Sequence, residues 1–219
     1  SEMFGEDNSK IKNENSEFKP ISPYAVAKLY SYWMVRLYRN GYGLFASNGI
    51  LFNHESSIRG LEFVTRKISN EIAKISLGLS KSIKLGNLSA KRDWGYAPEY
   101  VEGMWKMLQQ KTSDDFVLAT NETHSVGEFV DEACKVAGVS KSKIKTDKRF
   151  LRPMDVKNLR GDYKKAEKIL KWKPKITFKN LVKIMVEEDI NRWEKWLKKE
   201  IQPWDAVMSG EDSNIVSKK

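Results

Sequence analysis

The stretch LFASNGILFNHESSIRG, residues 44–60, joins an apolar run to a polar continuation. Residues 44–52 have the composition of a buried strand, which we expect to lie within a sheet. The polar residues that follow are Asn53, His54, Glu55, Ser56 and Arg59. Ligands of open α/β sheets bind beyond the carboxyl ends of the strands. The sequence therefore predicts that this loop faces a ligand crevice.

Helical and strand patterns alternate on both sides of this stretch. Pro23 opens a helix at its first turn, where a missing N–H costs nothing, and Gly41 is expected to end it. Further strands are expected at residues 83–85 and 116–120, and further helices at residues 63–77, 98–108, 125–138, 162–170 and 178–199. This alternation is typical of an α/β fold with two or three layers.

Two helices carry apolar residues at helical spacing. In the first these are Val26, Tyr30, Trp33 and Leu37. In the helix that begins at Pro98 they are Val101, Met104, Trp105 and Leu108. Such spacing is typical of a helix face that packs against a core.

The composition is that of a globular protein, with 219 residues, 40% hydrophobic and 31% charged. No run approaches the roughly 20 apolar residues that span a bilayer, so we expect a cytoplasmic protein. Cys134 is the only cysteine, which excludes a disulfide within the chain and indicates a small core residue.

The net charge of +10 arises from residues 141–200, which hold 20 Lys and Arg against 9 Asp and Glu. A basic surplus is compatible with an anionic partner, and a noncatalytic basic module that binds nucleic acid is one alternative. A solvated lysine-rich surface is the interpretation we favour. Trp172, Trp193 and Trp196 stand among these charges at helix-like spacing, which predicts core anchors.

SPYAVAK, residues 22–28, places Tyr24 and Lys28 four positions apart on the predicted helix. Residues at i and i+4 share a helix face, so both side chains can reach one site. A lysine ammonium beside a phenol lowers the tyrosine pKa from ~10, and such a tyrosine can accept a proton from a hydroxyl. Tyr-x-x-x-Lys is nevertheless common by chance, so the pair alone leaves open whether it is catalytic.

Three further charged residues are candidates for the site, and each also has a structural interpretation. Glu2 precedes Tyr24 by 22 residues and could serve as a second base, or be a surface glutamate. Arg92 and Arg152 each lie in a predicted turn or loop and could bind a diphosphate in fork geometry, or form structural ion pairs. His54 and His124 have no ligand partners at metal-binding spacing, so no metal site is expected.

Seven stretches, taken together, resemble the GDP-mannose 4,6-dehydratase family of extended short-chain dehydrogenases/reductases. In chain order they are SEMFG (1–5), SPYAVAK (22–28), GILFNHES (49–56), FVTRKI (63–68), GNLSAKRDW (86–94), YVEGMW (100–105) and RPMDV (152–156). The resemblance runs from Ser1 to about Arg192. It implies the later part of a Rossmann-like NAD(P)-binding fold with a small C-terminal substrate-binding domain.

The family is a group of hydro-lyases that use NADP as an internal redox cofactor and convert GDP-mannose to GDP-4-dehydro-6-deoxy-D-mannose. The resemblance implies that Tyr24 is the base for the C4 hydroxyl, Lys28 its partner and Glu2 the base at C5. Cofactor contacts fall on Tyr24, Lys28, His54 and Arg59. Substrate contacts fall on Asn53, Lys67, Arg92 and Arg152. Self-association as a dimer or tetramer is also implied.

The sequence departs from the family pattern in several places. The sequence contains no G-x-G-x-x-G turn, so we expect a fragment, residues 1–208, that holds interleaved Rossmann-like and substrate-binding segments and is inactive alone. Ser57 and Ile58 replace part of the family's HESPRRG motif. Residues 209–219 are polar and expected to be a disordered tail. Another NAD(P)-dependent nucleotide-sugar epimerase or reductase is the enzyme alternative.

Overall fold

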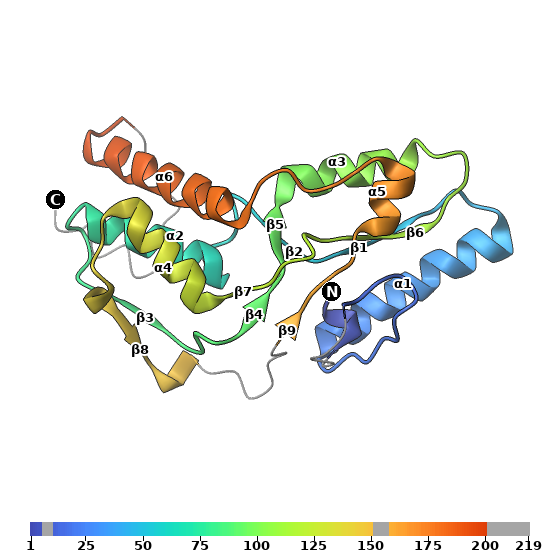
Figure 1. Ribbon diagram of the computed structural model, residues 1–219, viewed down its shortest axis with the longest axis horizontal. Coiled ribbons are helices and arrows are strands. Elements are labelled where there is room, and N and C mark those ends of the chain that lie inside the picture. The colour runs from blue at the N-terminus through green and yellow to red at the C-terminus, as the bar shows by residue number, and fades with distance from the viewer. Residues whose placement is uncertain (6–10, 151–157, 201–219) are drawn as a thin grey trace. The chain divides into compact units, whose positions relative to one another are not determined.

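The computed structural model describes residues 1–5, 11–150 and 158–200. The chain divides into two compact units, each assembled from three segments. Unit 1 comprises Ser1–Glu55, Ser89–Ser125 and Pro153–Phe178. Unit 2 comprises Ser56–Leu88, Val126–Arg152 and Lys179–Lys219. The helices and strands of both units are labelled in Figure 1.

Parallel strand pairs form the centre of unit 1. β1 (Asn48–Leu51) pairs with β6 (Asp115–Leu118), and β2 (Asn53–Glu55) pairs with β5 (Trp94–Tyr96). A three-stranded sheet places β4 (Lys91–Arg92) between β7 (His124–Ser125) and β9 (Asn158–Leu159). β4 is antiparallel to β7 and parallel to β9.

Helices cover both faces of the β1–β6 pair. On one face, Ile50 and Val117 pack with residues of η1 (Glu2–Phe4) and with Tyr32 of α1 (Pro23–Tyr42). On the other face, Phe116 and Leu118 pack with residues of α3 (Ala97–Leu108) and α5 (Lys164–Leu170). Side chains alternate between the two faces of a strand, so β6 contributes to both cores. Unit 1 therefore has the helix–sheet–helix layering of an α/β fold.

Unit 2 is mainly helical. Its helices are α2 (Val64–Ser76), α4 (Val126–Ala137) and α6 (Phe178–Leu197), of which α6 begins at the last residue of unit 1. Its strands β3 (Ile83–Leu85) and β8 (Ile144–Thr146) are parallel, and the short helices η2 (Lys141–Lys143) and η3 (Lys148–Phe150) flank β8.

The predicted core tryptophans are confirmed. Trp193 and Trp196 of α6 form a buried cluster with Ala73 of α2, and Trp172 is buried in the α3–α5 side of unit 1. Cys134 lies buried in α4, as predicted. Burial of these side chains contributes to the hydrophobic stabilisation of both units.

Several element boundaries predicted from the sequence were wrong. The expected strand at 44–52 is shorter, because Leu44 and Phe45 are exposed and only Asn48–Leu51 pairs. The first helix ends at Tyr42, where Gly43 adopts a left-handed conformation (φ 67°), rather than at Gly41. Gly43 can adopt this conformation at little cost because it has no Cβ.

Two segments expected to be loops or turns are strands. Asn53, His54 and Glu55 form β2, and Lys91 and Arg92 form β4. Both strands carry polar residues, but each has a partner distant in sequence that supplies its backbone hydrogen bonds.

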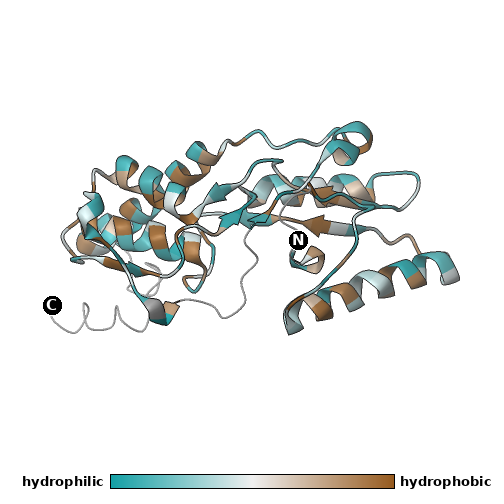
Figure 2. Cartoon of the chain, turned by 60° about the horizontal axis from the view of Figure 1, so that its bottom comes forward, coloured by the Kyte–Doolittle hydropathy of each residue, from teal (hydrophilic) through white to brown (hydrophobic). Residues whose placement is uncertain are grey.

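The apolar faces predicted on α1 and α3 are exposed in the described chain. Tyr30 is 66% exposed and Trp33 55%, whereas Ala25 and Tyr32 on another face of α1 are buried. On α3, Val101, Trp105 and Leu108 are also exposed. Figure 2 shows hydrophobic residues recurring along α1, the helix at lower right. Helical spacing identified these helices correctly but not the face that packs against the sheet.

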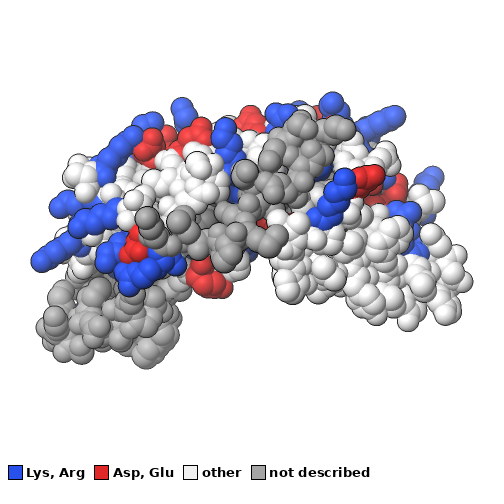
Figure 3. All heavy atoms as spheres, turned by 90° about the horizontal axis from the view of Figure 1, so that it is seen from below, with Lys and Arg blue, Asp and Glu red and all other residues white. Residues whose placement is uncertain are grey.

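The basic residues do not form one uninterrupted patch on the face shown in Figure 3, where acidic side chains stand among them. Many described lysines and arginines pair with carboxylates, as in Lys141–Asp131, Arg149–Asp147 and Lys183–Glu187. This arrangement favours a solvated surface over a groove that binds nucleic acid. Among the described helices, none is both long enough and apolar enough to cross a membrane.

Candidate active site

Tyr24 and Lys28 lie together at the start of α1. Ser22 caps the helix, since its hydroxyl accepts a hydrogen bond from the backbone N–H of Ala25 (3.1 Å), and Pro23 occupies the first turn. The Nζ of Lys28 lies 5.6 Å from the centre of the Tyr24 ring. Tyr24 is 61% exposed in the described chain. The capped helix start therefore presents a phenol and an ammonium group on one accessible face.

A buried carboxylate anchors this helix to the sheet. Asp115 of β6 accepts hydrogen bonds from Arg36 (2.7 Å) and Arg39 (2.8 and 3.1 Å) of α1, and from Asn48 of β1 (2.9 Å). The hydroxyl of Tyr32 also donates to Asp115 (3.2 Å). Burial raises the pKa of Asp115, but the hydrogen bonds and charges of the arginines outweigh it and lower the pKa to about 2.

Glu2 lies in η1, half-buried, next to the end of β1. The nitrogen of Ser1 donates a hydrogen bond to the carbonyl of Leu51 (2.8 Å). Phe4 stacks on Phe18, which in turn packs edge-on against Tyr32 of α1. These contacts place the residue predicted as the C5 base in the same unit as Tyr24 and Lys28.

Gly5 closes η1 in a conformation that no other residue would adopt without a clash. Its φ is +63°, and a Cβ there would lie 1.7 Å from the carbonyl oxygen of Lys19. A residue with a side chain would therefore displace the loop that packs on η1. The close approach of the two backbones fixes η1, and with it Glu2, relative to this loop.

Asn53 and His54 lie in β2. The Nδ1 of His54 is 2.9 Å from the carbonyl of Phe52, so this nitrogen carries the proton, and the ring stacks on Tyr100 (5.2 Å between ring centres). The side-chain oxygen of Asn53 is buried and accepts no hydrogen bond from a described residue. A buried acceptor of this kind can be satisfied by a bound ligand or by water.

Further buried polar atoms of unit 1 share this property, among them three that were not identified from the sequence. They are the hydroxyl of Tyr100 and the side-chain oxygens of Asn121 and Asn158, none of which has a hydrogen-bond partner among the described residues. Single asparagines and tyrosines carry no distinctive spacing, so sequence patterns could not have revealed them.

Arg92 ends β4, and the next residue, Asp93, is fully buried. Asp93 accepts hydrogen bonds from the backbone N–H groups of Thr120 (2.8 Å), Asn121 (3.1 Å) and Gly161 (3.1 Å), and from the Thr120 hydroxyl (2.7 Å). Burial raises the pKa of Asp93 to about 6, although these hydrogen bonds act in the opposite direction. The Nη1 of Arg92 donates to the carbonyl of Lys91 (2.9 Å).

Arg59 and Lys67 lie in unit 2. The guanidinium of Arg59 is 3.5 Å from the ring centre of Phe63, and the Nζ of Lys67 is 3.8 Å from that of Phe150. These are cation–π distances. Arg152, the remaining predicted substrate contact, lies outside the described residues. Unit 1 thus contains six of the predicted site residues: Glu2, Tyr24, Lys28, Asn53, His54 and Arg92.

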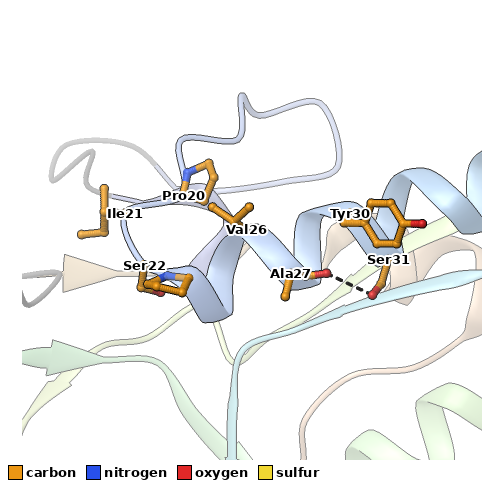
Figure 4. Close-up of a pocket in the computed structure, with 8 residues that line it drawn as sticks. Pro20, Ile21, Ser22, Val26, Ala27, Tyr30 and Ser31 are labelled. Atoms are coloured by element: carbon orange, nitrogen blue, oxygen red, sulfur yellow. Dashed lines mark hydrogen bonds between the residues drawn. The ribbon is translucent and has the colours of Figure 1, made fainter.

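An open groove adjoins the start of α1 but does not include the Tyr24–Lys28 pair. It has a volume of about 920 Å³ and is lined by Pro20, Ile21, Ser22, Pro23, Val26, Ala27, Tyr30 and Ser31. Figure 4 shows these side chains, with the Ser31 hydroxyl bonded to the carbonyl of Ala27. The described residues contain no group of three His, Cys, Asp or Glu side chains that could hold a metal ion.

Solved structures of other proteins share this fold at low sequence identity. RMD from Pseudomonas aeruginosa, complexed with NADPH, matches with a TM-score of 0.80 at 20% identity, over 87% of this chain and 64% of that one. A dTDP-glucose 4,6-dehydratase from Bacillus anthracis, in complex with NAD, matches with a TM-score of 0.79 at 18% identity, over 90% and 61%. The predicted α/β, Rossmann-like fold class is confirmed.

Relatives matched by sequence have a higher identity to this chain than these structures do. The chain is 50% identical over 191 residues to GDP-mannose 4,6 dehydratase 1 of Arabidopsis thaliana. The matched region covers 87% of this chain and 53% of the relative. The chain is 47% identical over 210 residues to GDP-mannose 4,6 dehydratase of Homo sapiens, over 87% and 56%. The chain thus spans about half the length of the curated relatives it matches. The family model for GDP-mannose 4,6 dehydratase matches residues 1–185. This chain therefore belongs to the GDP-mannose 4,6-dehydratase family.

Proposed function

We propose that this chain supplies the Tyr–Lys pair and the substrate-holding residues of a GDP-mannose 4,6-dehydratase. Such an enzyme converts GDP-mannose to GDP-4-dehydro-6-deoxy-D-mannose and water. The observation that carries the proposal is the position of Tyr24 and Lys28 on one face of a capped helix start in a chain of this family. The 4-keto product would be a precursor of deoxyhexoses such as fucose.

The side chains divide the proton transfers between them. Tyr24, beside the Lys28 ammonium, accepts the proton of the C4 hydroxyl. NADP, when bound, would take the hydride from C4 and return it to C6. A ketone at C4 acidifies the C5 proton, which the carboxylate of Glu2 accepts. The C6 hydroxyl leaves with a proton as water, and a proton returns to C5 as the hydride arrives at C6.

The residues present fit a dinucleotide and a nucleotide sugar. Lys28, His54 and Arg59 offer hydrogen-bond donors or positive charge to the cofactor, and the buried oxygen of Asn53 offers an acceptor. Lys67, Arg92 and Arg152 are cations suited to a diphosphate. The proposal therefore assigns NADP as cofactor and GDP-mannose as substrate.

Self-association is part of the proposal. The exposed apolar face of α1, with Tyr30, Trp33 and Leu37 each more than half exposed, supports association as a dimer or tetramer. A cytoplasmic location, with nucleotide sugars and NADP at hand, is also part of it.

The test joins this chain to the N-terminal half of the Arabidopsis relative and measures conversion of GDP-mannose. The chimera is expected to form a 4-keto-6-deoxy product, and Tyr24→Phe to lower kcat by about 10²- to 10⁴-fold. Tyr30→Phe, on an exposed face of the same helix, is the matched control and should retain activity. A chimera that epimerises or reduces its substrate without losing water would contradict the proposal.

A second measurement concerns the chain alone. It has no Gly-rich phosphate-binding turn, so we expect it to bind NADP more weakly than the micromolar range. Titration of the isolated chain with NADPH, followed by fluorescence, measures this affinity. Micromolar binding would show that the cofactor site is complete without a further half.

A further inference from the structure

A buried ionic cluster in unit 2 is not explained by any role assigned so far. Arg66 of α2 and Asp189 of α6 are both fully buried. The Nε of Arg66 donates to both carboxylate oxygens (3.1 and 3.0 Å), and its Nη2 donates to Oδ1 (2.7 Å). The Ser69 hydroxyl donates to Oδ2 (2.6 Å). The carboxylate is therefore fully hydrogen-bonded.

The cluster extends to the loop of residues 56–63, which connects β2 to α2. The Nη1 of Arg66 donates to the carbonyl of Arg59 (3.0 Å). The Nη1 of Arg192, which also contacts Asp189 (3.2 Å), donates to the carbonyl of Ser57 (2.6 Å). Two charged groups, both held by one carboxylate, thus bind two carbonyls of this loop.

The loop carries Arg59, whose side chain makes a contact that does not involve the cluster. Its guanidinium lies 3.5 Å from the ring centre of Phe63, the residue that caps α2. The backbone N–H of Phe63 donates to the carbonyl of Gly60 (3.2 Å), and this bond closes the turn from Gly60 to Phe63. Arg59 is therefore held through its carbonyl by Arg66 and through its side chain by Phe63.

A purely stabilising role would not require the contacts to the loop. Buried ion pairs are often no more stabilising than well-packed apolar residues, because both charges lose their hydration. An apolar pair could join α2 to α6 equally well, but it could neither donate to the carbonyl of Arg59 nor hold Arg192, which donates to that of Ser57. The contacts to these carbonyls are what a positioning function would need.

We propose that Arg192 and the Arg66–Asp189 pair are positioning residues, which hold the loop of residues 56–63 so that Arg59 can bind an anionic group of the dinucleotide. The inference rests on the proposed function, since Arg59 is assigned to the cofactor by family resemblance. It adds three residues that touch neither substrate nor cofactor and act through Arg59.

Arg192→Met tests this in the full chain, because it removes the bond to Ser57 and leaves the Arg66–Asp189 pair in place. Lys183→Met is the control, since it removes a positive charge from an exposed position on the same helix. Arg192→Lys is the second variant should the methionine variant not fold, because a shorter ammonium cannot reproduce the guanidinium contacts. Circular dichroism and thermal melting check the folding of each variant.

Two readouts are compared. Hydrogen exchange of the amides of residues 58–63, measured in the 219-residue chain, should be about tenfold faster in Arg192→Met and unchanged in Lys183→Met. The Kd for NADPH, measured in the chimera with the Arabidopsis half, should rise about tenfold in Arg192→Met. In an Arg59→Met background, Arg192→Met should change this Kd by less than about twofold, because its effect passes through Arg59.

Three results would overturn the inference: unchanged exchange in the loop, faster exchange with an unchanged Kd, or additive effects of the Arg59 and Arg192 substitutions. A chimera that binds NADPH but does not convert GDP-mannose would refute the proposed function alone, and the Kd comparison would still decide the positioning role. A chimera that does not bind NADPH would overturn both.

Discussion

Replacement of Asp115 by asparagine should loosen the helix that carries Tyr24 and Lys28. Asp115 is 4% exposed and holds Arg36 and Arg39 of α1 against β1 and β6. Its pKa is lowered from 3.8 to about 2 in the folded chain. Because a tenfold change in a dissociation constant is worth about 1.4 kcal/mol, the ionised carboxylate contributes about 2 kcal/mol near neutral pH.

The sign of the pH dependence follows from the direction of this shift. The folded pKa lies below the unfolded value of 3.8, so the unfolded chain takes up the proton first as the pH falls. The contribution is therefore full well above pH 4 and is lost between about pH 4 and pH 2. Asp115→Asn should lower the free energy of unfolding by about 2 kcal/mol at pH 7, with a Tm decrease of about 4–8 °C for a chain of this size.

Urea unfolding of the wild type and the variant at pH 7, 5, 4 and 3, followed by circular dichroism, measures this difference. Asp114→Asn is the matched control. Its side chain is 46% exposed and pairs with Lys165 at the surface, so it should cost less than about 1 kcal/mol. The reasoning would be refuted if Asp115→Asn cost no more than Asp114→Asn, or if the difference stayed constant down to pH 3.

Three other predictions concern buried groups. Burial raises the pKa of Asp93 to about 6, above its unfolded value. The wild type should therefore lose about 2–3 kcal/mol of unfolding free energy as the pH rises from 4 to 6. Urea titrations of Asp93→Asn should not show this loss. Burial also raises the pKa of the Cys134 thiol, so alkylation at pH 7.5 should be at least about a hundredfold slower than in denaturant, and rapid labelling of folded protein would contradict its burial. Gly161→Ala should lower the free energy of unfolding by about 1–3 kcal/mol in thermal or urea unfolding, because the added methyl would lie 2.4 Å from that of Ala119. The control is Gly41→Ala, which should not lower it, because an added Cβ there has no neighbour within 4 Å.

Local patterns were sufficient to predict most helices of this chain. The apolar spacing of α2, and the glycine that follows α4, gave their positions to within one or two residues. The buried faces of α1 and α3 were not predictable in the same way. Tyr32 faces the core of unit 1 because Asp115 and Phe18 meet it there, and neither is near it in sequence.

The short strands and the ionic clusters depend on contacts that no local pattern contains. Asn53 and Arg92 looked like loop residues because their side chains are polar, whereas their backbones pair with Trp94 and Leu159. Arg66 and Asp189 are 123 positions apart, so nothing in either neighbourhood indicates that they meet. Tyr24, Lys28 and the polar continuation of residues 53–59 could be proposed as site residues from the sequence because the stretches that contain them together resemble those of one family.

The segmented construction of the two units constrains how the chain can fold during synthesis. The chain passes from one unit to the other after residues 55, 88, 125, 152 and 178. Unit 1 cannot complete its core until α5 and Trp172 have been made, and unit 2 lacks Asp189 and Trp193 until α6 has left the ribosome. Unit 2 therefore cannot finish folding before unit 1 has been fully translated, and a ribosome that stalls before α6 would leave the apolar surface that α6 covers in unit 2 exposed.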